Sequence, residues 1–274
     1  MTPFRIRSPD VTLFVDPALE RRVDRLELPW SSLGIDPYGV EKHAVARMMT
    51  ALQLFYRRYF RVKVTGIDNV PTHGRAMLIG NHSGGVAIDA AMVIGACFFE
   101  MEPPRLAQGM VEKFIEHVPV ASIMAARCGQ VPGLPEHAVR LLRDERLLMV
   151  FPEGARGTAK LFHERDSLVD FGTGFMRLAM QTKTPIIPFG VVGAGEALPT
   201  VYNAYALGKI FGVPYVPFTP WLLPIPVPAK MGIHFGEPIV CEGTGREDDE
   251  QVRSKVDEVK ERIASLIAWG RSRT

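Results

Sequence analysis

A histidine and an aspartate lie close together in the segment NHSGGVAID, at residues 81–89. The apolar run before it predicts a strand that ends near His82, followed by a turn through Gly84 and Gly85 and a helix that contains Asp89. Ligands bind at the carboxyl ends of strands in open α/β sheets, so reactive side chains belong at such a turn. A histidine accepts a proton near neutral pH, and a nearby carboxylate can stabilise the imidazolium. The pair indicates general-base chemistry; the alternative is a turn histidine that bonds only to backbone.

A second polar turn follows another apolar run, in the segment VFPEGARG at residues 150–157. The pattern predicts a strand and a tight turn that bring Glu153 and Arg156 to the same sheet edge as His82. A guanidinium group grips phosphate or carboxylate with two hydrogen bonds, and glycines let backbone amides approach an anion closely. The segment therefore indicates a site for an anionic or strongly polar group, although the same residue types are common in exposed charged turns.

Short apolar runs alternate with helical segments through the middle of the chain. The runs are predicted as strands at residues 75–80, 146–151 and 185–193, and the helices at residues 86–98, 135–143 and 172–182. Strands that are apolar along their whole length belong to a mainly parallel sheet that is covered on both faces. We therefore predict an α/β fold with a mainly parallel central sheet flanked by helices.

The two ends of the chain differ from this α/β region. Residues 1–39 are predicted to be a leader without regular structure, and residues 40–62 to form an amphipathic helix with a basic C-terminal end. That basic end can favour the helix dipole or rest on anionic lipid headgroups, and both interpretations stay open. Residues 63–274 are the predicted α/β domain, which closes with an amphipathic helix from about Glu247.

Composition and charge exclude several classes of protein. The 274 residues are 47% hydrophobic, enough for one substantial core, and the net charge of +2 does not indicate a nucleic-acid partner. Cys97, Cys128 and Cys241 are too few for a disulfide framework and form no metal-binding pair. The first residues lack the apolar stretch of a signal peptide, and no apolar run is long enough to span a bilayer. We therefore expect no bound metal, and a cytoplasmic protein that is peripheral on the inner face of the membrane.

Four segments in the same order resemble the motifs of the lysophospholipid acyltransferase superfamily, over about residues 45–240. NHSGGVAID is similar to the family's histidine–aspartate motif, and FPEGARG to its acceptor-binding turn. KFIEHVPVASIMAARCGQVPG, at 113–133, is similar to the second motif, and PIIPFGVVG, at 185–193, to the fourth. The resemblance implies a membrane-associated enzyme that moves a fatty acyl group from acyl-CoA or acyl carrier protein to a lipid hydroxyl, with no resident cofactor.

Positions that match these motifs acquire roles by the same resemblance. His82 is the implied base, which removes the proton of the acceptor hydroxyl as that oxygen attacks the thioester carbonyl. Glu153, Gly154 and Arg156 are implied to hold the acceptor. The expected lining of the same site, including candidate backbone donors to the oxyanion, comes from Asn81, Ser83, Gly84 and Gly85.

Two departures from the family pattern bear on the partner of His82 and on the acceptor. The usual spacing places the aspartate at position 87, which is Ala87 here, so Asp89 is the predicted partner, with Glu153 or no side chain as alternatives. The second motif carries Gln130 where phosphate-handling members commonly have an arginine. These features resemble the monoacylglycerol-acyltransferase-like branch, and both a lysophospholipid and a neutral glyceride stay open as acceptors.

The segment at residues 211–228, FGVPYVPFTPWLLPIPVP, is almost wholly apolar and contains six prolines. So many prolines exclude a regular helix or a central strand. Apolar surface without regular structure either closes a core or is offered to an apolar partner. We interpret the segment as a flap that covers the acyl chain or dips into a membrane, and a buried loop is the alternative. Its expected contacts are Tyr215, Phe218, Trp221 and Leu222.

Two other functions fit parts of the sequence. NHSGG resembles the nucleophile elbow G-x-S-x-G, with Ser83 as the nucleophile and His234 as the late histidine of an esterase triad. The other is a lipid-binding or lipid-carrying protein of the same fold, because the shifted aspartate can mean that catalysis was lost.

Overall fold

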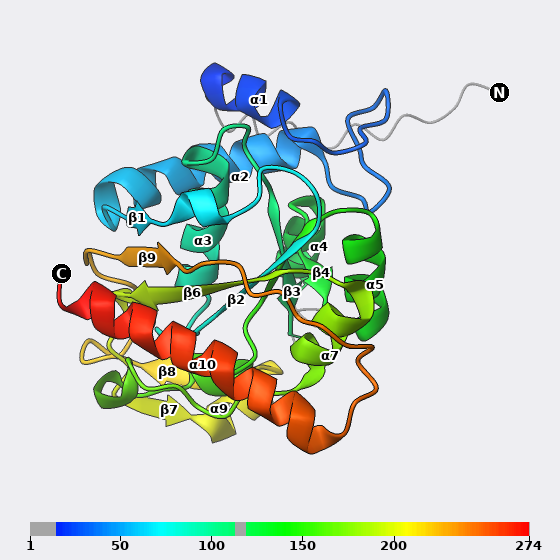
Figure 1. The fold of residues 1–274 in the computed structure, drawn as a ribbon. Helices are drawn as coiled ribbons and strands as arrows, with labels where there is room; N and C mark the ends of the chain where they lie inside the picture. The colour runs from blue at the N-terminus through cyan, green and yellow to red at the C-terminus, as the bar shows by residue number, and fades with distance from the viewer. Residues whose placement is uncertain (1–14, 113–118, 274) are drawn as a thin grey trace.

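The computed structural model describes residues 15–112 and 119–273. Its centre is a seven-stranded sheet in the order β1-β9-β6-β2-β5-β3-β4 (Figure 1). The strands are β1 (Lys63–Thr65), β2 (Ala76–Gly80), β3 (Ala107–Val111), β4 (Val131–Pro132), β5 (Leu147–Val150), β6 (Ile186–Val192) and β9 (Gly232–Phe235). Strands β2 to β6 run parallel, whereas β9 is antiparallel to β6 and β1 is parallel to β9. The predicted mainly parallel α/β sheet is therefore confirmed.

Helices cover both faces of this sheet. One face carries α2 (Lys42–Leu54), which runs on into the π-helical turn η1 (Phe55–Tyr59), and α3 (Ile88–Phe99), with α1 (Pro17–Asp24) packed on α2. The other face carries α5 (Pro135–Arg143), α7 (Gly174–Thr182) and α10 (Asp249–Arg271), and Figure 1 shows α10 lying across the sheet. Short helices in the connections are η2 (Ile67–Asn69), α4 (Pro119–Arg127), α6 (Ala155–Thr158), η4 (Phe162–Glu164), α8 (Ala194–Ala197) and α9 (Tyr205–Phe211).

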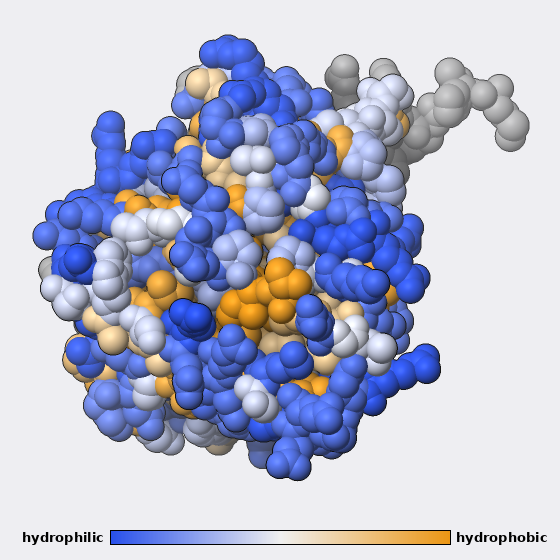
Figure 2. Space-filling view, viewed as in Figure 1, coloured by the Kyte–Doolittle hydropathy of each residue, from blue (hydrophilic) through white to orange (hydrophobic). Residues whose placement is uncertain are grey.

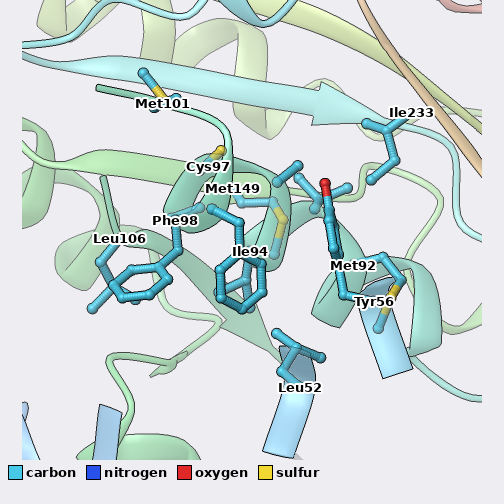
Figure 3. Packing of buried hydrophobic residues seen from close by; sticks show 14 of the residues in the cluster. Leu52, Tyr56, Met92, Ile94, Cys97, Phe98, Met101, Leu106, Met149 and Ile233 are labelled. Atoms are coloured by element: carbon cyan, nitrogen blue, oxygen red, sulfur yellow. The ribbon is translucent and has the colours of Figure 1, made fainter. Parts of the chain in front are cut away.

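Two hydrophobic cores follow from the alternation of side chains along each strand. In β2, Leu78 faces the core beneath α2 and α3, whereas Met77 faces the core beneath α5, α7 and α10. Figure 3 shows part of the first core, in which Leu52 and Tyr56 lie near the side chains of α3, Phe98 among them. Because both faces of the central strands are buried, these strands are apolar along their whole length, which explains why the sequence pattern located them.

The leader contains more regular structure than its sequence pattern predicts. Asp16 caps α1 by accepting a hydrogen bond from the main-chain N–H of Ala18 at 2.8 Å, and Pro17 occupies the first helical position. Arg22 of this helix donates to the main-chain carbonyl of Phe98 at 2.7 Å. The prediction of an irregular leader is therefore wrong over α1, and the Asp-Pro pair is the sequence signal that indicates this helix.

Between β6 and β9 the chain leaves the main sheet, and we call residues 201–228 the excursion. Its strand β7 (Tyr202–Ala204) pairs antiparallel with β8 (Val216–Phe218), and α9 connects the two. In Figure 1 the excursion lies at the lower left, below β6. Its proline-rich end after β8 contains no helix or strand, in agreement with the sequence-based prediction.

The described part of the chain offers no helix that is both long and apolar enough to cross a bilayer. Figure 2 shows that the face carrying α10 is largely hydrophilic, with apolar surface near its centre, over the loop that joins β9 to α10. Val240 of that loop is 78% exposed.

The approach of β2 to β6 generates a prediction about stability. A Cβ atom at Gly80 would lie 2.2 Å from the ring of Phe189, which is fully buried, so Gly80→Ala must displace that ring. We expect the free energy of unfolding in urea to fall by about 1–3 kcal/mol, as for other overpacked cores. Gly174→Ala is the matched control, because no atom lies within 4 Å of a Cβ atom there. Equal stability of the two variants would contradict the close packing of Phe189 on β2.

Candidate active site

The turn between β2 and α3 is closely packed against the segment that follows β6. Gly84 and Gly85 have φ angles of 88° and 69°, in the left-handed region that favours glycine. A Cβ atom at Gly84 would lie 2.7 Å from the carbonyl oxygen of Ala194, and one at Gly85 would lie 2.6 Å from Leu198 Cδ2. Conformation and space therefore both require glycine in this turn.

His82 and Asp89 meet across this turn. His82 Nδ1 lies 2.8 Å from Asp89 Oδ2, and the same oxygen accepts the main-chain N–H of Ser83 at 2.8 Å. The Asp89 side chain is fully buried, whereas the His82 side chain is 11% exposed. Because Nδ1–H donates its hydrogen bond to the carboxylate, Nε2 is the ring nitrogen that can exchange a proton with a substrate.

Aromatic packing fixes the plane of the imidazole. The His82 ring stacks on Phe151 with 4.2 Å between centroids and 18° between planes. Phe151 in turn packs edge-on against Phe189, with centroids 5.7 Å apart. Phe151 directly follows β5 and Phe189 lies in β6, so the main sheet holds the ring by stacking while Asp89 holds it by a hydrogen bond. The orientation of the imidazole is therefore fixed by the protein itself.

Glu153 supports His82 through its main chain. Its Oε1 accepts the main-chain N–H of His82 at 2.9 Å, and its Oε2 accepts the N–H of Val169 at 3.0 Å. Lys160 Nζ lies 2.5 Å from the same Oε2, and the Glu153 and Lys160 side chains are 0% and 2% exposed. Glu153 thus contacts the backbone of His82 and not its ring, so it is not the partner of the imidazole. Because it is buried with both oxygens occupied, direct contact with the acceptor, which the sequence implied, is not supported.

Asn81 links the turn to β6. Its side-chain Nδ2 donates to the carbonyl of Val191 at 2.9 Å, and its Oδ1 accepts the Val191 N–H at 2.7 Å. The amide therefore continues the strand pairing at the end of β2. These two bonds use the amide group that sequence reasoning had assigned to the substrate.

The FPEGARG turn lies beside the His82 turn, as expected. A Cβ atom at Gly157 would lie 2.8 Å from the Cβ of His82, which shows how closely the two turns approach. Gly154 has a φ angle of 55°, again in the left-handed region. The neighbouring Arg156 is exposed, and its Nη2 donates to the carbonyl of Asp170 at 3.0 Å. Its guanidinium group is therefore accessible to an acceptor, in contrast to the buried Glu153.

The predicted second motif is only partly described, because residues 113–118 lie outside the described residues. Gln130, which stands where an arginine is common, accepts the main-chain N–H of Gly109 at 2.9 Å and donates to the carbonyl of Cys128 at 3.3 Å. Gln130 therefore joins β3 to the end of α4.

The inner side of the excursion packs on the His82 turn. The Tyr215 hydroxyl lies 3.2 Å from the carbonyl oxygen of Gly85 and 2.5 Å from Thr158 Oγ1, and the Gly85 N–H donates to the Thr158 carbonyl at 3.1 Å. Burial raises the pKa of Tyr215 to about 12, so the hydroxyl stays protonated at neutral pH. Tyr215 therefore faces the His82 turn rather than the surface. Of the other predicted flap contacts, Phe218 is half-buried, and Trp221 and Leu222 are exposed.

The residues of the alternative esterase triad do not come together. His234 Nδ1 lies 2.8 Å from Thr65 Oγ1, and its ring packs edge-on against Trp269 at 4.9 Å between centroids. Burial and the charge of Arg273 lower the pKa of His234. These contacts engage His234 beside β1 and α10, whereas the buried Ser83 lies in the turn after β2.

Three supporting residues were missed by sequence reasoning. Phe151 directly precedes the segment PEGAR, and its position is typical of the end of an apolar strand. Thr158 and Lys160 follow the turn, and the sequence does not distinguish them from ordinary polar residues. Only the cluster of charged and small residues in GARGTAK sets this region apart. No local pattern shows that Lys160 turns inward.

Comparisons with known proteins identify a family and relatives of this chain. A family model described as Acyltransferase matches residues 61–192, which include both turns. An uncharacterized protein of Mycobacterium tuberculosis is 33% identical over 247 residues, which cover 85% of this chain and 68% of that protein. A human protein, named DGAT1/2-independent enzyme synthesizing storage lipids, is 26% identical over 178 residues, which cover 65% of this chain and 53% of the relative.

A solved structure has a similar fold. The crystal structure of the 1-acyl-sn-glycerophosphate acyltransferase PlsC from Thermotoga maritima matches with a TM-score of 0.57 and 17% sequence identity. The match covers 83% of this chain and 81% of that one. At this identity the likeness concerns the fold.

The buried Glu153–Lys160 pair generates a prediction that separates charge balance from packing. Lys160→Met alone or Glu153→Gln alone leaves one buried charge without its partner, so each should lower the free energy of unfolding by about 3–5 kcal/mol. The double variant removes both charges and keeps a side-chain oxygen for the His82 N–H. Its loss in free energy of unfolding should therefore be clearly smaller than the sum of the losses in the two single variants. Urea denaturation of the four proteins measures this coupling. Strictly additive losses would contradict a direct pair.

Proposed function

Because the chain belongs to the acyltransferase family, we propose that it transfers a fatty acyl group from an acyl thioester to the hydroxyl of a glycerolipid, with His82 as the general base. The single observation that carries this proposal is the 2.8 Å contact between His82 Nδ1 and the buried carboxylate of Asp89, across a turn at the end of a central strand. A partly exposed imidazole that is oriented in this way is suited to remove a proton from an alcohol.

The proposed reaction proceeds in two steps. His82 Nε2 takes the proton of the acceptor hydroxyl as that oxygen forms a bond to the thioester carbonyl carbon, and Asp89 stabilises the resulting imidazolium. The tetrahedral intermediate then collapses, the carbon–sulfur bond breaks, and the imidazolium returns the proton to the departing thiolate. The products are an ester and a free thiol, and neither a metal nor a covalent acyl-enzyme is needed.

The oxyanion of this intermediate needs a hydrogen-bond donor. Of the three candidate amides in the turn, that of Ser83 donates to Asp89 and that of Gly85 donates to the Thr158 carbonyl. Within the described part of the chain, Gly84 is the one of the three whose N–H has no such partner, so we propose Gly84 as the donor.

The acceptor and donor are proposed by class. One relative is named for storage-lipid synthesis, and the structural neighbour is a 1-acyl-sn-glycerophosphate acyltransferase, which together support a glycerolipid acceptor. The exposed Arg156 beside the His82 turn supports binding of an anionic or strongly polar part of that acceptor. We propose acyl-CoA or acyl carrier protein as the donor, and the inner face of a membrane as the place where the protein meets its acceptor.

The dyad generates a test that also separates this proposal from its rivals. His82→Ala should lower kcat for transfer of acyl groups from acyl-CoA to monoacyl glycerolipids by roughly 10²–10⁴-fold, the usual contribution of a general base. Asp89→Asn should lower kcat with little change in KM. Ser83→Ala is the control and should keep most of the activity, since Ser83 contributes its backbone N–H to the dyad. If Ser83→Ala loses activity while His82→Ala and Asp89→Asn keep it, the protein is an esterase and the proposal is wrong. If the folded wild-type protein extracts lipid from vesicles but transfers no acyl group, the protein is a lipid carrier.

The exposed guanidinium of Arg156 generates a second test. A charge-assisted hydrogen bond contributes about 1.5–3 kcal/mol, so Arg156→Gln should raise KM for the acceptor by roughly tenfold or more while kcat changes little. Arg156→Lys keeps the positive charge but loses the two-pronged geometry of the guanidinium group, so its KM for the acceptor should lie between those of the wild type and Arg156→Gln. Measuring both variants with lysophosphatidate and with monoacylglycerol shows which acceptor group the arginine binds. Unchanged KM for both acceptors would contradict a role in acceptor binding.

A further inference from the structure

We propose that the outer side of the excursion and the adjoining residues 54–63 form one docking face for a lipid bilayer that contains anionic headgroups. The proposal deepens the proposed function and rests on it in one respect, because a glycerolipid acceptor lies in a membrane. The docking face itself is argued from exposure, backbone strain, charge and contacts.

Exposed apolar side chains are concentrated in the excursion. Nine large hydrophobic residues of this short segment are exposed: Val201, Tyr202, Tyr205, Ile210, Phe211, Trp221, Leu222, Leu223 and Ile225. Such a concentration of exposed apolar side chains on a folded protein indicates a site of interaction. Aromatic residues mixed with aliphatic ones are typical of segments that lie at the boundary of headgroups and acyl chains.

Leu222 is held in a strained backbone conformation. Its φ angle is 70°, in the left-handed region, and its side chain is 68% exposed. Leucine in this backbone conformation lowers the stability of the folded protein more than glycine or asparagine would. Because the Leu222 side chain is exposed, packing in the isolated protein does not offset that loss. The turn is nevertheless fixed, since the Leu222 N–H donates to the Thr219 carbonyl at 2.9 Å and the Trp221 indole donates to the Ile225 carbonyl at 3.0 Å. An apolar side chain is thus presented at a turn tip at the expense of stability, which fits a partner that is apolar.

The stretch of sequence that contains the excursion carries only positive charges, whereas one exposed acidic residue, Glu100, lies beside Tyr56 of the adjoining turn. Between Glu196 and Glu237 the sequence contains no acidic residue, whereas Lys209 and Lys230 are both exposed. The Tyr59 hydroxyl donates to the carbonyl of Pro226 at 2.8 Å, which joins the excursion to the π-helical turn.

That turn adds cations and further apolar surface to the same face. Leu54 and Phe55 are exposed there, and Arg58, Arg61 and Lys63 follow as exposed cations. Each cation near an anionic membrane surface contributes about 1 kcal/mol to binding. The two segments for which the sequence suggested membrane contact, far apart along the chain, are therefore in direct contact and complementary to an anionic bilayer.

The docking face is connected to the candidate site through Tyr215. Outside, the excursion presents Trp221 and Leu222; inside, the Tyr215 hydroxyl contacts the Gly85 carbonyl and Thr158 Oγ1. A bilayer on the outer side therefore lies one layer of protein from the turn that carries His82. A lipid acceptor would reach the base from the membrane without crossing bulk water.

Vesicle flotation tests the proposal on the full chain. Wild-type protein should float with phosphatidylcholine vesicles that contain phosphatidylglycerol, and much less with phosphatidylcholine alone. Leu222→Asn should lower the partition coefficient by about tenfold, the loss expected when one leucine side chain is no longer buried in an apolar phase. The same variant should raise Tm, because asparagine accepts a positive φ more readily. Weaker vesicle binding in a more stable protein cannot result from unfolding.

Two controls complete the experiment. Val240→Ser removes an apolar side chain of similar exposure from the α10 face and should bind vesicles as the wild type does. His82→Ala should also bind normally, so loss of acyl transfer and loss of docking are separate results. Unchanged binding in Leu222→Asn, or a loss in Val240→Ser, would overturn the proposed face. A wild-type dimer in solution that Leu222→Asn dissociates would also overturn it, because the face would then bind a second copy.

Discussion

The candidate site depends on one buried carboxylate. Asp89 lies in the first turn of α3, where the helix dipole favours a negative charge, and it accepts hydrogen bonds from the His82 ring and from the N–H groups of Ser83 and Ala90. A carboxylate without exposed surface is tolerated only when such partners satisfy it. The start of the helix, the path of the turn and the orientation of the imidazole are therefore set together, and none of them can move alone.

A second buried carboxylate holds the main chain of the same turn. Glu153 binds the main chain of His82 and of Val169, and Lys160 balances its charge. The two acidic residues thus divide the work, since Asp89 acts on the ring and Glu153 on the backbone. This division explains how a residue of the FPEGARG turn supports His82 without contacting its ring.

How much of this could be predicted depends on how local the cause is. Strands β2, β5 and β6 and helices α3, α5 and α7 lie within two residues of their predicted bounds, because burial on two faces or one leaves a regular apolar pattern. The pairing of His82 with Asp89 was also predicted, since the glycine turn absorbs the wider spacing before α3 begins at Ile88. Tyr215 could not be predicted, because its burial depends on contact with Gly85, 130 positions away. Lys160 could not be predicted either, because no periodic pattern marks a lysine that turns inward to pair with the buried Glu153.

The contact between Tyr215 and Gly85 has a consequence for how proteins of this fold diverge. The Tyr215 hydroxyl contacts the Gly85 carbonyl, whereas Trp221 and Leu222 are exposed, so changes at those two positions leave this contact in place. The tyrosine and Thr158, in contrast, share a hydrogen bond, so a change in one side chain affects the other. A lineage can thus exchange the exposed residues of the excursion while the packing of Tyr215 on the glycine turn is passed on intact.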